Sequence, residues 1–317
     1  MTTGTVFDLF CGAGGASLGI HAALSGADVI GVDLDLQACA THEAAGFKTV
    51  NADVSEMSPA EALGCEGMWA SPPCTAYTLL GSRRGLGALE EVQEALRTWE
   101  VGATFPQEDP LIWLVAEPLR WAFTVQPAWV ICEQVPSVLP IWRTIGARLA
   151  EVGYHVWSGI LNAADYGVPQ TRERACLLAS RLAPVSPPTP TRTRHPHPRL
   201  DGTEERPWVT MASALGWDAH KGPRWCHERP ATTIVGDARV YPPDGHHPDM
   251  QMGHASRRAV KITLAEMAVL QGFPAHYPFV GSKTAVARQI GNAVPPPLAR
   301  ACTHAVTGLQ RGSEAML

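Results

Sequence analysis

The sequence predicts an α/β fold with a doubly wound, mostly parallel sheet, and two observations support this. Short apolar runs of strand length alternate along the first half of the chain with segments whose apolar residues recur at helical spacing. The first apolar run, residues 5–10, enters a glycine-rich turn, and the second, residues 27–32, ends at Asp33. This order is typical of nucleotide-binding sheets, although a glycine turn without a ligand is also common.

The remaining elements continue the alternation. Further strands are expected at residues 48–50, 67–70 and 129–132, and helices at residues 16–24, 86–100, 111–124, 141–152 and 263–270, with a final helix near the end. Residues 184–198 contain too many prolines for regular structure, which predicts a linker or an extended arm.

The composition is that of an ordinary globular chain. Its 317 residues are 45% hydrophobic and 17% charged, enough for one large domain or two lobes. No apolar run approaches the ~20 residues of a membrane helix, and no secretory leader precedes the first strand. The eight cysteines form no C-x-x-C pair and the histidines have no ligand spacing, so we expect neither disulfides nor a metal site. The sequence therefore predicts a cytoplasmic protein.

Charge is distributed unevenly along the chain. Residues 1–171 carry 7 basic and 19 acidic residues, a net charge of −12, whereas residues 172–261 carry 14 and 9, a net charge of +5. An acidic half joined to a basic, histidine-rich middle indicates that a polyanion binds one face. A basic loop region that is simply solvated explains the charge equally well.

Three chemically active groups are expected at the ends of strands. Cys74 follows two prolines after the strand at 67–70, so it lies on a rigid turn rather than in a helix or central strand. Glu133 follows the strand at 129–132, and Arg172 and Arg174 follow a Gly-Val-Pro-Gln turn. A thiol, a carboxyl and two guanidinium groups on one rim indicate a site for covalent chemistry on a base.

With these residues in place, the chain resembles the C5 cytosine-specific DNA methyltransferases almost from end to end. The matching stretches, in the family's order, are residues 8–15 (DLFCGAGG), Pro73-Cys74, Glu133-Gln134-Val135, residues 170–174 (QTRER), residues 229–234 (RPATTI), residues 270–274 (LQGFP) and residues 289–294 (QIGNAV). Each stretch alone is weak, but their shared order leaves little room for chance. The resemblance implies a Rossmann-like, S-adenosylmethionine-dependent methyltransferase sheet.

The resemblance also implies a mechanism. Cytosine C5 is a poor nucleophile, so Cys74 would first add to C6, a step suited to a thiolate. Glu133 would supply a proton or hydrogen bond to N3, and Arg174 would hold O2 and orient Glu133, with Arg172 a lesser partner. The cytosine would be flipped out of double-stranded DNA to reach these groups.

The family pattern further assigns residues to S-adenosylmethionine and to DNA. Cofactor binding is implied for Phe10, Gly12, Gly14, Asp33, Leu34, Asp53 and Asn292. Leu34 stands where an aromatic residue often covers the adenine. Arg83 and Arg84 lie on a glycine-containing loop after Cys74 that suits a lid closing on phosphates, and Gln170 is a further candidate DNA contact.

Some positions depart from the family pattern. Thr75 and Thr78 replace the usual Gln and Ser, and Gln134 replaces Asn. We expect a catalytic and cofactor-binding domain at residues 1–180, a small, irregular target-recognition region with linkers at 181–260, and a C-terminal segment at 261–317 that returns to the catalytic domain. So small a recognition region predicts a short or degenerate DNA recognition sequence.

Two other functions were weighed. A branch of the family methylates tRNA, but the Cys-Phe-Thr segment of that branch is not found here. A non-catalytic DNA-binding homologue would need none of Cys74, Glu133 and Arg174. We expect a monomer, with a cognate restriction enzyme as a possible partner. The sequence does not distinguish a restriction system, a phage enzyme and an orphan enzyme, and it gives no recognition site.

Overall fold

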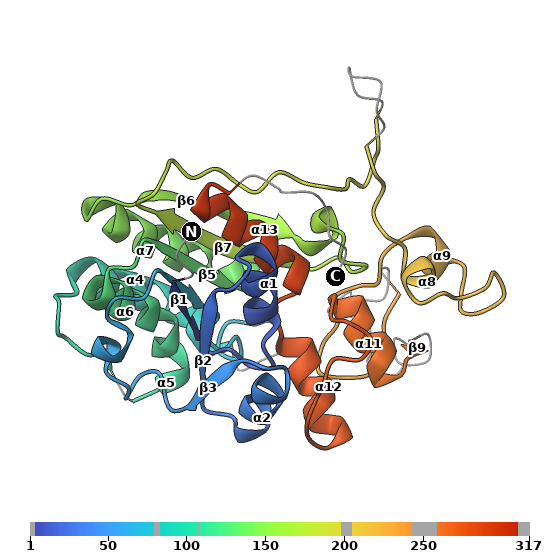
Figure 1. Cartoon of the computed structure of the whole chain (residues 1–317), viewed down its shortest axis with the longest axis horizontal. Helices are drawn as coiled ribbons and strands as arrows, with labels where there is room; N and C mark the ends of the chain where they lie inside the picture. The colour runs from blue at the N-terminus through green and yellow to red at the C-terminus, as the bar shows by residue number, and fades with distance from the viewer. Residues whose placement is uncertain (1–3, 79–82, 107, 198–204, 243–258, 310–317) are drawn as a thin grey trace.

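The structure is a computed structural model that describes residues 4–78, 83–106, 108–197, 205–242 and 259–309. Its centre is a seven-stranded sheet with the strand order β3-β2-β1-β4-β5-β7-β6 (Figure 1). The strands are β1 (Thr5–Leu9), β2 (Asp28–Asp33), β3 (Lys48–Asn51), β4 (Gly67–Ala70), β5 (Trp129–Gln134), β6 (His155–Asn162) and β7 (Glu173–Ser180). The predicted α/β class is confirmed.

The sheet is parallel from β3 to β5, and β7 runs antiparallel to both β5 and β6. The strands β6 and β7 are not among the elements predicted from the sequence. Short runs such as Leu177-Leu178-Ala179 fit a buried strand or a buried helix equally well, and length alone does not separate the two.

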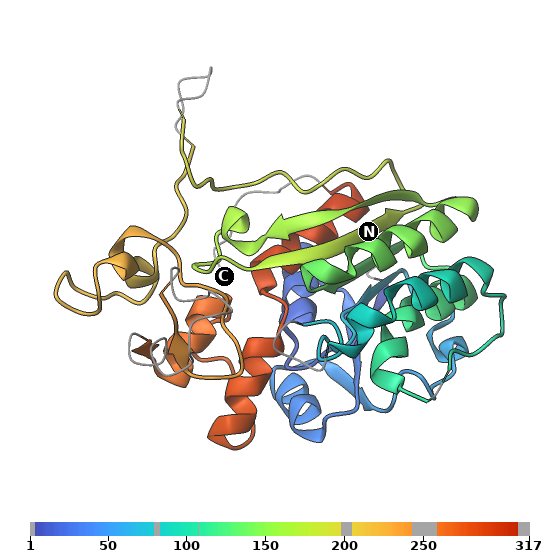
Figure 2. The ribbon, with the colours of Figure 1, turned by 180° about the vertical axis from the view of Figure 1, so that it is seen from behind.

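Helices cover both faces of the sheet, as Figures 1 and 2 show. Alternate strand residues point to opposite faces, so Phe7 belongs to one apolar core and Val6 to the other. The core that contains Phe7 also includes residues of α4 (Leu89–Thr98), α6 (Glu117–Val125) and α7 (Leu139–Glu151). The core that contains Val6 is closed by α1 (Gly15–Ala23) and α13 (Pro296–Thr307), while α2 (Leu36–Ala44) lies beside β2 and β3.

The helix α13 packs directly on α1. A Cβ atom at Gly19 in α1 would lie 2.5 Å from the Cβ atom of Ala299 and 2.5 Å from the carbonyl oxygen of Pro296. Only glycine permits this approach, so the end of the described chain completes the layer begun by its first helix.

Two predicted helices are interrupted. The helix expected at 86–100 consists of α3 (Arg84–Gly87) and α4, and the one expected at 111–124 consists of α5 (Pro110–Trp113), the 3₁₀ turn η2 (Leu114–Ala116) and α6. Pro118, in the first turn of α6, has no N–H group to continue a helix from the preceding residues. Further 3₁₀ turns are η1 (Pro59–Ala62), η3 (Pro136–Val138) and η4 (Ala163–Tyr166).

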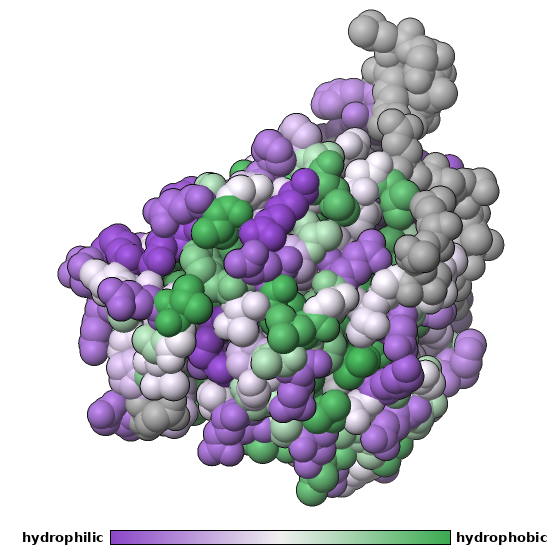
Figure 3. Space-filling model, turned by 60° about the vertical axis from the view of Figure 1, so that its left-hand side comes forward, coloured by the Kyte–Doolittle hydropathy of each residue, from purple (hydrophilic) through white to green (hydrophobic). Residues whose placement is uncertain are grey.

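A third apolar core lies beside the sheet layers (Figures 1 and 2). It is built from small elements: α8 (Met211–Ala214), α9 (Trp225–Glu228), β8 (Arg239–Val240), β9 (Val260–Lys261), α11 (Leu264–Gln271) and α12 (Lys283–Asn292). The proline-rich segment before it has no helix in its described part and forms an arm in which Thr193 pairs with Pro207. On the face drawn in Figure 3, apolar residues lie scattered among hydrophilic ones.

Candidate active site

Cys74 lies just beyond the carboxyl end of β4, a central strand between β1 and β5. The indole of Trp69 donates a hydrogen bond to the hydroxyl of Ser71 at 2.7 Å, which fixes the start of the Pro-Pro turn. The carbonyl of Cys74 accepts hydrogen bonds from the N–H groups of Tyr77 (2.8 Å) and Thr78 (3.1 Å). The thiol is therefore carried on a tight, internally bonded turn, as predicted from the two prolines.

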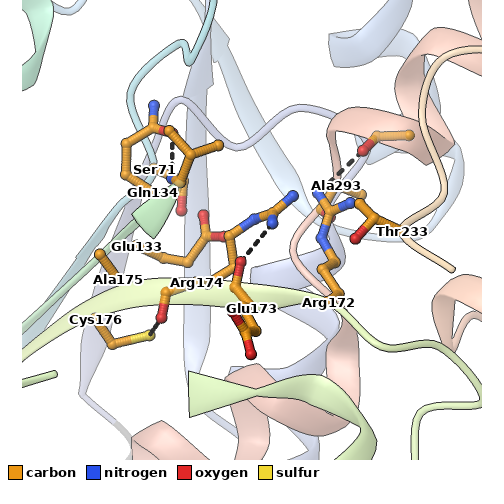
Figure 4. A network of polar contacts seen from close by, with 12 residues as sticks. Ser71, Glu133, Gln134, Arg172, Glu173, Arg174, Ala175, Cys176, Thr233 and Ala293 are labelled. Atoms are coloured by element: carbon orange, nitrogen blue, oxygen red, sulfur yellow. Dashed lines mark hydrogen bonds and ion pairs between the residues drawn. The ribbon is translucent and has the colours of Figure 1, made fainter. Parts of the chain in front are cut away.

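Glu133 lies within β5, immediately beside β4, and is buried. Its carboxylate pairs with the guanidinium of Arg174, with 3.0 Å between Nε and Oε1 (Figure 4). The antiparallel register sets Glu133 opposite Cys176 on β7, so Arg174, two residues before Cys176, points to the same face of the sheet. Both side chains are about nine-tenths buried, which strengthens the ion pair.

The thiol of Cys74 interacts electrostatically with these groups. Burial raises the pKa of Cys74 above its ordinary value; Arg174 and Arg172 oppose this rise, and Glu133 adds to it. Structure and sequence analysis thus agree in bringing Cys74, Glu133 and Arg174 close together. The raised pKa keeps the thiol mainly protonated at neutral pH.

Arg172, predicted as a lesser partner at the base, interacts electrostatically with Cys74 and is bonded to backbone carbonyls. It is buried, and its two amino groups donate to the carbonyls of Ile234 (3.1 Å), Gly291 (3.0 Å) and Ala293 (3.2 Å). Burial lowers its pKa to about 9. The guanidinium joins the segment before β7 to the third core, a role that the motif did not indicate.

Gln170 is fully buried, which does not fit the predicted DNA contact. Its amide nitrogen donates to the carbonyl of Leu270 and to the side chain of Gln271, and its oxygen accepts from the N–H of Ile234. The donor and acceptor groups of this buried side chain are all hydrogen-bonded to protein groups. The side chain therefore stabilises the packing here and is not available to a ligand.

Gln134 links the segments that carry the thiol and the carboxyl. Its side-chain nitrogen donates to the carbonyl of Pro72 at 2.7 Å, and its oxygen accepts from the N–H of Val135 at 2.5 Å. Figure 4 shows Gln134 beside Ser71 at this point. In the sequence this residue stands out only as a departure from the family pattern. An amide directly after Glu133 could have suggested a bridge between the strand that carries Glu133 and the turn that carries Cys74.

A second group of predicted residues surrounds the glycine turn after β1, residues 10–14, called here the cofactor turn. Three of its residues have positive φ angles: Phe10 (61°), Gly12 (53°) and Gly14 (87°). The N–H of Gly12 donates to the carboxylate of Asp33 at 2.8 Å, which ties the turn to the end of β2. Burial raises the pKa of Asp33. Glycine and a left-handed backbone let a ligand approach the turn closely.

The surroundings of the cofactor turn fit a nucleoside such as S-adenosylmethionine. A Cβ atom at Gly12 would meet nothing within 4 Å, so that side of the turn is open. Asp33 ends β2, and Asp53 follows the neighbouring strand β3. Leu34, directly after Asp33, is 66% exposed. Ser55 donates to the Asp53 carboxylate through its N–H and its hydroxyl. Asn292 is exposed at the end of α12.

The two arginines of the predicted lid lie at the start of α3, and residues 79–82 of that loop lie outside the described residues. Arg83 has a positive φ angle of 57°. Arg84 pairs with Asp109 at 2.8 Å, and its side chain is more than half exposed. Among the described residues, no group of three His, Cys, Asp or Glu side chains could hold a metal ion, and no helix could span a membrane.

Comparison with known proteins agrees with this geometry. The family model for C-5 cytosine-specific DNA methylases matches residues 4–205 and 197–307. The type II methyltransferase M1.HphI of Haemophilus parahaemolyticus is 27% identical over 342 residues, covering 95% of this chain and 86% of the relative. The type II methyltransferase M.NgoFVII of Neisseria gonorrhoeae is 26% identical, covering 92% and 83%.

Solved structures show the same fold. The S. pombe Dnmt2 methyltransferase superposes with a TM-score of 0.59 at 16% identity, covering 94% of this chain and 96% of that one. The Entamoeba histolytica methyltransferase EhMeth has a TM-score of 0.61 at 13% identity, covering 97% and 99%. With the family model matching nearly the whole described chain, this protein belongs to the C-5 cytosine-specific DNA methylase family and is a cytosine methyltransferase.

Proposed function

We propose that this chain methylates carbon 5 of cytosine in double-stranded DNA, with S-adenosylmethionine as donor and Cys74 as nucleophile. The observation that carries the proposal is the Arg174–Glu133 ion pair, 3.0 Å long and about nine-tenths buried, in electrostatic contact with the Cys74 thiol. A protein that only bound DNA would gain nothing from a buried carboxyl and guanidinium beside a thiol.

Each of these residues has a separate role in the proposed reaction. The Cys74 thiolate forms a C–S bond to C6, and the displaced electron pair moves toward N3 and O2 of the ring. Glu133 would donate to N3 after taking up a proton, and the Cys74 thiol releases one as it becomes the thiolate. Arg174 holds Glu133 in place and donates to O2. The C5 atom made nucleophilic in this way would then form a bond to the donor's methyl group. Loss of the C5 proton and of the Cys74 thiolate would restore the ring with the methyl group in place. The side chains of Glu133 and Arg174 are about nine-tenths buried, so the target cytosine would leave the DNA helix to reach them.

S-adenosylmethionine supplies an electrophilic methyl group when bound. We assign its amino-acid moiety and ribose to the cofactor turn, Asp33 and Asn292, and its adenine to Leu34 and Asp53. Arg83 and Arg84 are assigned to phosphate contact, for which Arg84 must exchange Asp109 for a phosphate. Arg172 and Gln170 hold the framework together from within.

A DNA substrate is favoured over tRNA because the relatives that match most of the chain are named type II methyltransferases. We further propose a cytoplasmic, monomeric enzyme. The small recognition region supports a short or degenerate recognition sequence, and the type II names of the relatives make a cognate restriction enzyme a possible partner. Two relatives of the fold are Dnmt2 proteins, so tRNA is the alternative to be tested.

The decisive experiment is transfer of labelled methyl from S-adenosylmethionine to duplex DNA and to tRNA, with Cys74→Ala in parallel. We expect label on cytosine C5 of DNA and at least a thousandfold loss in the variant, since its remaining groups cannot form the C–S bond. Base-resolved mapping then reads the recognition sequence. Label on tRNA alone would refute the DNA assignment, and undiminished transfer by Cys74→Ala would refute the mechanism.

A further inference from the structure

We propose that Tyr277 is a positioning residue for the methyl donor: its hydroxyl holds the carbonyl of Ala13 and thereby keeps the cofactor turn in its binding shape. Tyr277 lies in the connection between α11 and α12, far from the cofactor turn in sequence and outside every stretch that indicated a cofactor site. The inference rests on the proposed function and adds to it a residue that contacts neither substrate.

The hydrogen bond itself is short and well protected. The Tyr277 hydroxyl donates to the Ala13 carbonyl at 2.6 Å, and Ala13 is 1% exposed. Burial raises the pKa of Tyr277 above its ordinary value, so the hydroxyl keeps the proton that it donates. A carbonyl buried this deeply loses free energy when a donor is removed, because water does not easily replace it.

The ring of Tyr277 is fixed independently of that hydrogen bond. Its centroid lies 4.6 Å from that of Phe273 and 5.0 Å from that of Phe279. Phe273 belongs to the third core, against which Tyr277 and Phe279 pack. The hydroxyl is thus held at the cofactor turn by the third core rather than by the turn it contacts.

The cofactor turn has little freedom on this side. A Cβ atom at Gly14 would lie 2.8 Å from the Tyr277 hydroxyl oxygen and 2.8 Å from Cδ2 of His42, so the turn is packed between the two rings. At Gly12 the other side is open. A ligand on the open side meets a backbone that Tyr277 supports from behind, which reduces the free energy needed to order the turn on binding.

The test compares Tyr277→Phe with Tyr154→Phe in the full chain. Both changes remove only a hydroxyl: that of Tyr154 donates to the Pro127 carbonyl, also at 2.6 Å, in another part of the molecule. Calorimetric titration with S-adenosylhomocysteine measures binding without methyl transfer. We expect Tyr277→Phe to weaken binding about five- to tenfold, as loss of one buried hydrogen bond predicts, and Tyr154→Phe to leave it unchanged.

Steady-state kinetics separate positioning from general loss of structure. In Tyr277→Phe the KM for S-adenosylmethionine should rise by a similar factor, while kcat and the KM for DNA stay within about twofold. Equal weakening by both variants, or unaltered binding by Tyr277→Phe, would overturn the inference while leaving the proposed function intact. No binding by the wild-type chain would overturn both.

Discussion

Gln134 shows how one side chain can hold the turn that carries Cys74 in register with the strand that carries Glu133. Its amide bridges the carbonyl of Pro72, two residues before Cys74, and the N–H of Val135, two residues after Glu133. An alanine at this position leaves two buried backbone groups without that partner, and the thiol turn can then shift relative to the carboxyl.

We therefore expect Gln134→Ala to lower kcat at least tenfold and the free energy of unfolding by about 1–3 kcal/mol. Gln134→Asn should recover part of the rate, because it retains an amide but is one methylene shorter. Gln93→Ala is the control: its amide donates to Pro140 and Thr144 at the surface. Single-turnover methyl transfer checks the prediction, and equal losses in Gln134→Ala and Gln93→Ala would contradict it.

A buried polar chain lies beneath the cofactor turn. The Ser17 hydroxyl lies 2.6 Å from Asp8 and 2.8 Å from Nε2 of His42, and the other ring nitrogen of His42 lies 2.7 Å from Thr49. The second carboxyl oxygen of Asp8 has no hydrogen-bond partner in the described part of the chain. Burial raises the pKa of Asp8 to about 7 and lowers that of His42 to about 4.

These two shifts act on stability in opposite directions. Between about pH 4 and 7, Asp8 is protonated when folded and ionised when unfolded, so its contribution to the free energy of unfolding falls as pH rises. Between about pH 6.5 and 4, His42 is neutral when folded and charged when unfolded, so its contribution falls as pH falls. In the wild-type chain the two slopes oppose each other between about pH 4 and 6.5.

The substitution Asp8→Asn removes the contribution of Asp8 to the pH dependence of the free energy of unfolding and leaves that of His42. We expect the free energy of unfolding of the variant, relative to the wild type, to be higher at pH 8 than at pH 4 by about 4 kcal/mol, and this advantage to be lost steadily on acidification. Urea unfolding at half-unit pH steps measures the difference. A difference that does not change with pH would mean that Asp8 is ionised in the folded chain throughout.

The single residues that sequence predicts best are those whose chemistry has few substitutes. Cys74 and Glu133 could be named from their types and their places after apolar runs. The placements of Gln170 and Arg172 could not, because a Gln or Arg beside a strand serves a ligand or a buried carbonyl equally well. Only the positions of Ile234, Leu270 and Gly291, 60 to 120 residues away, decide between these uses.

At the scale of elements, short helices depend on their ends. The helix α11 begins with a capping box, in which Thr263 accepts from the N–H of Glu266 and the Glu266 carboxylate accepts from the N–H of Thr263. The helix α11 has only about two turns, so its own backbone hydrogen bonds stabilise it little. Its first turn therefore depends on the capping box and on packing against the third core.

We expect Thr263→Ala to lower the free energy of unfolding by about 1 kcal/mol. Thr98→Ala, at the end of α4, is the matched change. The exposed Thr98 hydroxyl donates to two carbonyls of its own helix. Its loss should lower the free energy of unfolding by less than about 0.5 kcal/mol. Thermal unfolding of both variants makes the comparison. Equal costs would show that the capping box adds nothing.

The elements predicted correctly are those with an unambiguous period and clear ends, such as β1, α1 and β2. The strand β7 is not predicted because its apolar run is compatible with two structures. The helix predicted at residues 111–124 is interrupted because Pro118 has no N–H group to continue the preceding turn. The division into three sequence ranges stays a prediction. The arm from Thr193 to Pro207 is held by backbone pairing that its prolines did not suggest.

At the scale of the whole molecule, Arg172 joins the sheet to the third core through three carbonyls from two segments, Ile234 in one and Gly291 and Ala293 at the end of α12 in the other. Arg172→Met removes all three donors, and the carbonyls remain buried. We expect a loss of at least about 3 kcal/mol in the free energy of unfolding, with earlier protease cleavage in the third core than in the sheet.

Arg181→Met provides the comparison for Arg172→Met. Arg181 donates to the carbonyls of Gln126 and Val152, both within the sheet layers, so its loss should cost less and leave the order of cleavage unchanged. Urea unfolding and mass-mapped proteolysis measure the two effects. The same cleavage order in both variants would show that Arg172 does not connect the two parts.

The packing of α13 on α1 has a consequence for synthesis on the ribosome. The apolar residues of α1 emerge first, but the helix that covers them is translated more than 270 residues later. At elongation rates of about 5–20 residues per second that interval is roughly 15 to 60 seconds, during which one face of the growing sheet stays uncovered. Nascent chains of this protein should thus be clients of ribosome-associated chaperones, and a circular permutant that places α13 before β1 should need them less.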